Sequence, residues 1–272
     1  MINPKPSISV NVDPTNPGQF FACCGLLELA DRIWGGAEGW FDSPRFHVSV
    51  GSLEDLLAIL VMDPPEEVHE LASGLLVKPL LAPLRLSLDG GASTAITLDA
   101  WVTVKVEKNQ AIAAPNQPWN FWSGQQTSFR IWRDLRTAVR GQLTSMSSDS
   151  LEDLFARPVM LSGRFGFDPG AAWNALDVGF SPNEQGIDVA SSAAVELLAA
   201  IGVQRFRPEL AEDRQSFIYA TWGQPLAPCV AAAAAGCAID VAPTKRFLGR
   251  VVSRGSYAAL GRSVPIRGEN HE

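Results

Sequence analysis

Hydrophobic and polar residues follow regular spacings through the first third of the chain. Residues 7–12 (SISVNV) alternate between polar and apolar side chains, as those of a half-buried strand do. A turn cluster follows, in which Asn16 can cap a helix and Pro17 can occupy its first position. Apolar residues then recur at helical spacing until Gly35 and Gly36, which are expected to end the helix.

Alternating residues and a helix cap predict further elements in this third. Residues 45–50 (RFHVSV) read as a second strand, paired with a short strand at residues 40–41. Ser52 is expected to cap a second helix, and residues 84–88 (LRLSL) supply another strand. The order β-α-β-β-α-β is that of a ferredoxin-like unit. RNA-recognition domains share this fold, but it hosts many functions and does not establish one.

We therefore expect an α+β protein with a ferredoxin-like unit over residues 1–110 and a mixed α/β region over residues 111–272, which could also form one continuous domain with it. In the second region the periodicity predicts helices and strands at residues 129–143, 191–201, 215–222 and 246–253. The polar residues 144–150 are expected to form a loop or linker.

The composition is that of a folded protein, with 46% hydrophobic and 19% charged residues. No apolar run reaches the ~20 residues that span a bilayer, and the N-terminus lacks the pattern of a secretory signal. We expect a cytoplasmic protein without a membrane partner. Cys23 and Cys24 are adjacent and read as small buried residues. Without a C-x-x-C pair or clustered histidines, neither a metal nor a cofactor is expected.

Charge is distributed unevenly along the chain. The formal net charge is −7, whereas proteins that bind nucleic acid usually carry a basic patch. Acidic residues are in excess over residues 1–72, but residues 241–268 contain no Asp or Glu. The basic residues of that C-terminal segment are Lys245, Arg246, Arg250, Arg254, Arg262 and Arg267. One acidic and one basic face are therefore expected, with an ordinary solvated surface as the alternative.

Aromatic and basic residues gather around the helix predicted at residues 129–143. Its arginines fall within about one third of the helical wheel, and they are Arg130, Arg133, Arg136 and Arg140. Trp119 and Trp122 precede the helix, together with Gln125 and Gln126. Bases stack on aromatic rings while arginines hold phosphates, so the mixture suits a nucleic-acid groove. A tryptophan-rich core beneath a solvated arginine face is the alternative, and the sequence leaves both open.

Sequence motifs of common catalytic centres are missing. The chain has no G-x-S-x-G elbow, no G-x-x-x-x-G-K-[ST] loop, no H-E-x-x-H and no G-x-G-x-x-G after a strand. His47 lies within the strand predicted at residues 45–50, where a polar edge position is commoner than a general base. We therefore expect a protein without catalytic residues.

Several segments resemble one protein family. They are VDPTNPGQFFACCGLLELADR at residues 12–32, FWSGQQ at 121–126, NALDVGFSP at 174–182 and ELLAAIGVQRFRP at 196–208. The first and last are long and specific, and the other two support them. Across residues 12–208 the chain resembles CRISPR-associated proteins of the type I-U (I-G) systems. It is similar to the small, large-subunit-type component of the RNA-guided complex called Cascade.

This resemblance implies a non-catalytic subunit that senses a short flanking motif and steadies the opened duplex. Its partners would be other Cascade subunits, guide RNA and target DNA, with cleavage left to a separate helicase-nuclease. Base pairing would read sequence while the protein holds backbones. Phosphate contacts are assigned to Arg130, Arg133, Arg136, Arg140, Lys245, Arg246, Arg250 and Arg254, and stacking or groove reading to Trp119, Trp122, Gln125 and Gln126.

Two alternatives stay open. A length of 272 residues is short for a large subunit, which leaves room for a subunit that binds the guide-RNA backbone or its end. The other alternative is a metal-independent ribonuclease that matures the guide, with His47 as its base.

Overall fold

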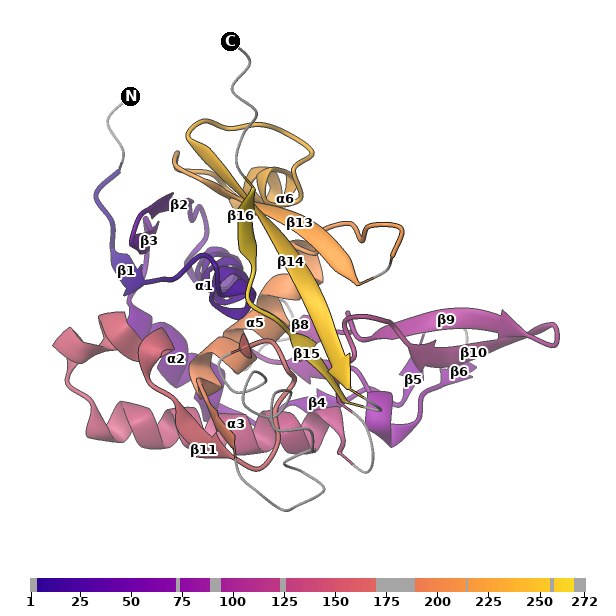
Figure 1. Ribbon diagram of the computed structural model, residues 1–272. Helices are drawn as coiled ribbons and strands as arrows, with labels where there is room; N and C mark the ends of the chain where they lie inside the picture. The colour runs from indigo at the N-terminus through magenta and orange to yellow at the C-terminus, as the bar shows by residue number, and fades with distance from the viewer. Residues whose placement is uncertain are drawn as a thin grey trace, which may run out of the picture.

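Helices and small antiparallel sheets build an α+β fold in the computed structural model (Figure 1). The structure describes residues 4–71, 74–88, 94–122, 126–169, 189–213, 215–254 and 257–266. The helices are α1 (Pro17–Trp34), α2 (Leu53–Met62), η2 (Pro79–Leu81), α3 (Ser128–Ser145), η4 (Ser148–Ala156), α5 (Ala193–Arg205) and α6 (Pro228–Ala235), with η marking 3₁₀ geometry. The strands are β1 (Ile8–Asn11), β2 (Gly39–Asp42), β3 (Arg45–Val48), β4 (Glu66–Glu67), β5 (Glu70–Leu71), β6 (Leu75–Leu76), β7 (Leu84–Leu86), β8 (Ile96–Leu98), β9 (Val102–Glu107), β10 (Gln110–Pro115), β11 (Val159–Leu161), β12 (Val189–Ser191), β13 (Ser216–Trp222), β14 (Thr244–Arg254), β15 (Tyr257–Leu260) and β16 (Val264–Ile266).

Helices α1 and α5 pack against each other at the centre of the fold (Figure 1). Most of their residues are buried, as expected for helices enclosed on all sides. Their backbones meet at two glycines. A Cβ atom on Gly25 would overlap the carbonyl oxygen of Leu198, and one on Gly202 would overlap that of Phe21. Glycine is required at both positions because any side chain would separate the helices.

The predicted helix ends in the first third are confirmed. The side chain of Asn16 accepts a hydrogen bond from the Gln19 amide (3.1 Å), and Pro17 occupies the first turn of α1. The helix stops before Gly35, whose φ of 74° lies in the left-handed region that glycine favours. Ser52 caps α2 as expected.

The N-terminal sheet has the strand order β1-β3-β2, with both pairs antiparallel. Apolar residues of β1 and β3, such as Val10 and Phe46, face the core, while Ser9 and His47 alternate with them. This order is that of the first three strands of a ferredoxin-like unit. The strand predicted at residues 84–88 forms as β7, but β7 pairs with β4 and β8 in a separate sheet. The complete ferredoxin-like unit is therefore not confirmed.

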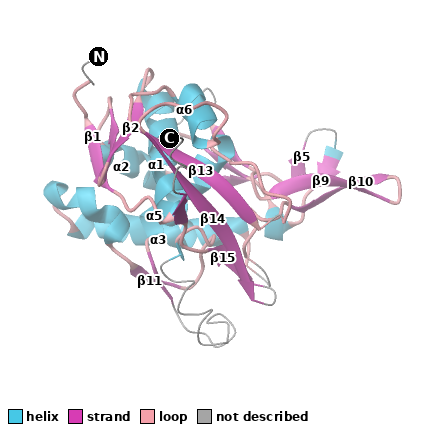
Figure 2. Cartoon of the chain, turned by 45° about the horizontal axis from the view of Figure 1, so that its top comes forward, coloured by secondary structure: helices cyan, strands magenta, loops and turns pink. Residues whose placement is uncertain are grey.

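Strands β9 and β10 form a hairpin that projects from the body of the molecule (Figures 1 and 2). We call residues 102–115 the projecting hairpin. Its register places Val102, Val104 and Val106 on the same face as Ala111 and Ala113. Val104 is 54% exposed and Val106 75% exposed. One face of the hairpin is thus apolar and open to solvent, whereas the other carries polar residues.

The C-terminal strands form a sheet of order β13-β14-β15, with β16 also paired to β14. This sheet joins the loop that precedes α1. The Tyr219 hydroxyl donates to the carbonyl oxygen of Pro14 (2.7 Å), and the Ser263 amide donates to that of Thr15 (2.8 Å). Arg262 forms an ion pair with Asp13 (2.6 Å). Residues from the two ends of the chain are therefore held side by side.

A hydrophobic core extends across both regions distinguished in the sequence. It includes residues of β1, α1, α3, α5 and β13, and the contacts between α1 and α5 join residues from either side of position 110. Residues 144–150 do not form the predicted linker. Helix α3 continues to Ser145, and η4 begins at Ser148 and buries Leu151, Leu154 and Phe155. Among the described residues, no helix is long and apolar enough to cross a membrane.

Candidate nucleic-acid interface

The tryptophan cluster before α3 belongs to the core. Trp119 is 3% exposed and Trp122 5% exposed, so neither ring offers a face on which a base could stack. Trp119 meets the ring of Phe21 edge-on, with ring centroids 5.8 Å apart. The indole nitrogen of Trp122 donates to the carbonyl oxygen of Leu80 (3.0 Å). The stacking role expected for both tryptophans is therefore wrong in this conformation, because hydrophobic burial has taken up both rings.

The two glutamines have different outcomes. Gln125 lies outside the described residues. Gln126 is half-buried, and its amide nitrogen donates to the carbonyl oxygen of Ser162 (3.3 Å). Gln126 thus connects the start of α3 to the segment after β11.

Two of the predicted arginines on α3 face solvent. Arg130 and Arg133 are exposed, and Arg133 lies 3.1 Å from the carboxylate of Asp134. An exposed pair of this kind contributes little to stability, so Arg133 remains available to an external anion.

Arg140 on α3 contacts the end of α2. Arg140 donates to the carbonyl oxygens of Val61 and, at 3.4 Å, Met62. These carbonyls end α2, where a cation is favoured by the helix dipole. Burial lowers the pKa of Arg136, and the nearby Arg140 lowers it further while Asp63 raises it. Arg140 therefore fastens α3 to α2, and the phosphate contact expected for it would have to break this arrangement.

The basic residues of β14 point to different sides of the sheet. Lys245 and Phe247 share one side, and Arg246 and Arg250 alternate with them on the other. Arg246 lies 3.9 Å from Asp240, and Lys245 has no ion-pair partner in the part of the chain that the structure describes. Nothing is described of the Arg254 side chain. The single basic face expected from the sequence is thus divided.

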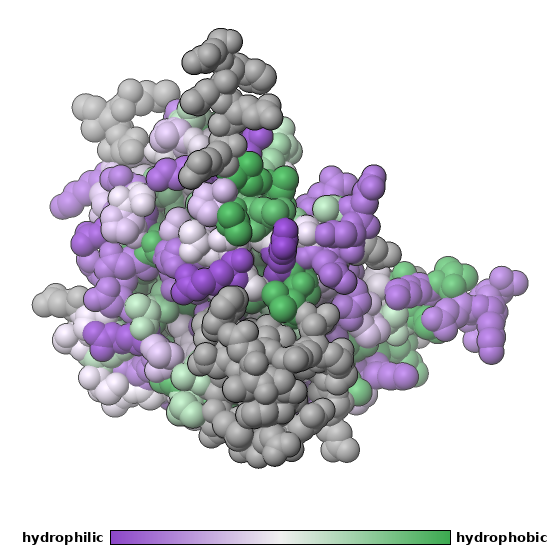
Figure 3. Space-filling view, viewed as in Figure 1, coloured by the Kyte–Doolittle hydropathy of each residue, from purple (hydrophilic) through white to green (hydrophobic). Residues whose placement is uncertain are grey.

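Apolar residues lie on the same side of the sheet as Arg246 and Arg250 of β14. Ile218 on β13 and Val264 on β16 both lie opposite Leu248, and they are 43% and 61% exposed. Figure 3 shows hydrophobic surface over these strands, next to hydrophilic atoms. This side of the sheet is therefore a mixed apolar and cationic surface.

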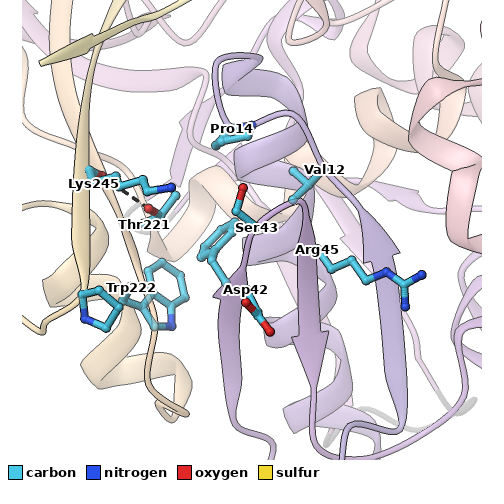
Figure 4. A pocket seen from close by; sticks show the side chains of 10 residues that line it. Val12, Pro14, Asp42, Ser43, Arg45, Thr221, Trp222 and Lys245 are labelled. Atoms are coloured by element: carbon cyan, nitrogen blue, oxygen red, sulfur yellow. Dashed lines mark hydrogen bonds between the residues drawn. The ribbon is translucent and has the colours of Figure 1, made fainter.

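A cavity of about 220 Å³ opens on the side to which Lys245 belongs. It lies between β2–β3 and β13–β14, and it is lined by Val12, Pro14, Phe41, Asp42, Ser43, Arg45, Thr221, Trp222, Pro243 and Lys245. Figure 4 shows the Lys245 amine beside Thr221, across the gap from Ser43. Asp42 lies toward the other end, and Arg45 points away. Arg45 instead pairs with Glu152 (3.2 Å).

His47 lies on β3 next to Trp40 and Ser9. Its Nδ1 is 2.8 Å from the Ser9 hydroxyl, and its ring centroid is 5.4 Å from that of Trp40. Burial lowers the pKa of His47, while the nearby Asp42 raises it. The imidazole is thus held by neighbours within its own sheet.

Sequence reasoning missed a buried acidic pair. Glu196 on α5 is 0% exposed, and its carboxylate accepts hydrogen bonds from the amides of Gly166 and Asp168, both at 2.9 Å. Burial raises the pKa of Glu196 to about 7, against the effect of these two amides. Asp168 in turn accepts from the Ser192 amide (2.9 Å) and from the Asn16 side chain (3.1 Å). The pair thereby connects the N-termini of α1 and α5.

Comparisons with known proteins add no relative. No protein-family model, curated protein or solved structure matches the chain. Within the described ranges, no group of three or more His, Cys, Asp or Glu side chains could hold a metal ion.

Proposed function

We propose that the chain is a non-catalytic subunit of a type I CRISPR RNA-guided surveillance complex, where it binds other subunits and holds target DNA or guide RNA. The resemblance over residues 12–208 supports this proposal, and two of its segments form the α1 and α5 pair at the centre of the core. The segment at residues 174–182 lies outside the described residues. Such a complex acts on nucleic acid in the cytoplasm, which is where we place the protein.

The projecting hairpin is the observation that carries the proposal. A two-stranded hairpin is marginally stable on its own, and exposed apolar side chains on such an element favour a binding surface. The face that holds Val104 and Val106 has no charged residue, so it suits an apolar groove of a protein better than a phosphate backbone. We propose that a neighbouring subunit covers this face.

Exposed cations support the nucleic-acid part of the proposal. Arg130 and Arg133 on α3, and Arg246 and Arg250 on β14, are exposed at the surface. Each phosphate that they neutralise would release counterions and make binding dependent on salt. In this proposal they hold backbones near the flanking motif, while the guide reads the sequence.

A guide-RNA subunit is the second candidate, favoured by the strand order β1-β3-β2. We propose that this sheet with α1 is a partial ferredoxin-like unit, the fold shared by RNA-recognition domains. Binding of guide RNA without DNA, insensitive to the flanking motif, would favour this candidate over the first.

Affinity purification tests the proposal. The tagged chain is expressed with its neighbouring genes and a CRISPR array, and stoichiometric protein partners with a short guide RNA are expected. The double variant Val104→Ser/Val106→Ser should lose a protein partner, since each apolar side chain left out of the interface costs about 1 kcal/mol or more.

The matched control changes the other face of the same hairpin. Glu107→Ser/Gln110→Ser replaces a cross-strand pair there and should retain every partner. If the wild-type chain elutes alone and without RNA, the proposed function is overturned. If both double variants behave alike, the hairpin does not carry the contact.

A further inference from the structure

The cavity beside Lys245 offers two opposite charges at its two ends. Lys245 supplies an ammonium group that is exposed and has no ion pair among the described residues. Asp42, toward the other end, supplies an exposed carboxylate. Because Arg45 pairs with Glu152 and points away, Lys245 is the cation directed at the gap (Figure 4).

An aromatic ring is held in place in the wall of this cavity. Phe41 is half-buried, and its ring meets that of Trp222 edge-on, with centroids 5.0 Å apart at an interplanar angle of 90°. The ring also contacts Phe46, at a centroid distance of 4.7 Å, and is stacked on Phe20, at 5.8 Å. These neighbours fix the ring before any ligand arrives, which lowers the entropic cost of stacking against it.

We propose that the cavity binds one nucleotide of a single-stranded nucleic acid. Lys245 contacts the phosphate, the base lies against Phe41, and Asp42 accepts a hydrogen bond from an exocyclic amino group of the base. The inference rests on the proposed function and names the kind of ligand that this site takes. A cavity of about 220 Å³ holds a base with part of its sugar, and a duplex does not fit.

The carboxylate predicts which bases are preferred. Cytosine presents an amino group at the position where uracil presents a carbonyl oxygen. The Asp42 carboxylate can accept a hydrogen bond from the amino group of cytosine. With uracil it would face a carbonyl oxygen, which is also an acceptor. A hydrogen bond to a charged group is strong enough to change affinity about ten-fold, so cytosine should be favoured over uracil by that factor.

Binding of short oligonucleotides to the full chain tests the inference. Fluorescence anisotropy is measured with labelled hexamers of cytidylate and of uridylate at several salt concentrations. The wild-type protein should bind the cytidylate hexamer about ten-fold more tightly. Asp42→Ala should remove this preference, and Lys245→Ala should weaken binding of both hexamers and reduce the salt slope by about 0.7, the value of one phosphate contact on a single strand.

Lys105→Ala is the matched control, because it removes an exposed lysine from the projecting hairpin. It should change either affinity less than two-fold, and circular dichroism should show that every variant is folded. Equal binding of the two hexamers by the wild-type protein overturns the inference, as does a Lys245→Ala protein that behaves like Lys105→Ala. If the hexamers bind equally but guide RNA and protein partners still co-purify, the inference fails and the proposed function stands. If the chain purifies alone but still prefers the cytidylate hexamer, the proposed function fails and the nucleotide site stands.

Discussion

The contact between α1 and α5 predicts a large loss of stability in Gly202→Ala. A Cβ atom at position 202 would lie only 2.9 Å from the Gly25 nitrogen, and it would overlap the carbonyl oxygen of Phe21. Both obstacles are backbone atoms of a buried helix, so no side chain can rotate away. The helices would have to separate in the middle of the core.

The expected magnitude follows from two opposing effects. Overpacking a close-packed core costs about 1–3 kcal/mol, and a contact between backbones falls at the upper end of that range. Alanine in place of glycine inside a helix gains up to about 1 kcal/mol. Gly202→Ala should therefore lower the free energy of unfolding by about 2 kcal/mol. Gly141→Ala on α3 should raise it by up to about 1 kcal/mol, since nothing lies within 4 Å of a Cβ atom there.

Urea denaturation followed by tryptophan fluorescence measures both effects. The Gly202→Ala midpoint should fall, the Gly141→Ala midpoint should rise, and the slope with urea should stay that of the wild type. If Gly202→Ala gains stability as Gly141→Ala does, the helices are not in backbone contact and the packing argument is refuted.

Two further predictions concern charged residues. Because the pKa of Glu196 is raised from 4.5 to about 7, the folded chain keeps a proton that the unfolded chain releases. The free energy of unfolding should therefore fall by about 3 kcal/mol as the pH rises from 4.5 through 7. Urea denaturation of Glu196→Gln at the same pH values should not show this fall. If the variant and the wild type had the same pH profile, burial of Glu196 would not be its cause. Arg140→Ala should lower the thermal midpoint because the end of α2 loses a donor worth about 1–2 kcal/mol, whereas Arg130→Ala on the exposed side should change it little. If Arg140→Ala and Arg130→Ala had the same thermal midpoint, the contact of Arg140 with the end of α2 would not stabilise the fold.

The sequence predicts those elements whose ends are set by local chemistry. Asn16 and Gly35 act within a single turn of helix, so the limits of α1 can be read from neighbouring residues. The fourth strand shows the limit of this reasoning. Residues 84–86 have the right alternation for a strand, but pairing with β8 instead of the N-terminal sheet depends on contacts that periodicity does not encode.

The candidate site is harder to predict because the same residue types serve a core and a groove. Trp119 and Trp122 suit base stacking as well as burial, and only the fold decides that they are enclosed. The arginines of α3 lie on one side of the helical wheel, but Arg140 donates a hydrogen bond to a carbonyl at the end of α2. Asp42 and Lys245 are far apart in the sequence, so no spacing indicates that they line the same cavity.

The bonds between the loop before α1 and the last strands affect how the protein can be made on the ribosome. Asp13 and Arg262 are 249 positions apart, and Thr15 likewise binds Ser263. Synthesis proceeds from the N-terminus, so this loop has no partners until residues 262 and 263 have emerged. Contacts so distant in sequence also form slowly, since a large loop must close first. The nascent segment around residues 13–15 therefore stays uncovered until the last described strands have been made, and a shortened chain lacking residues 257–266 should leave that surface exposed to chaperones.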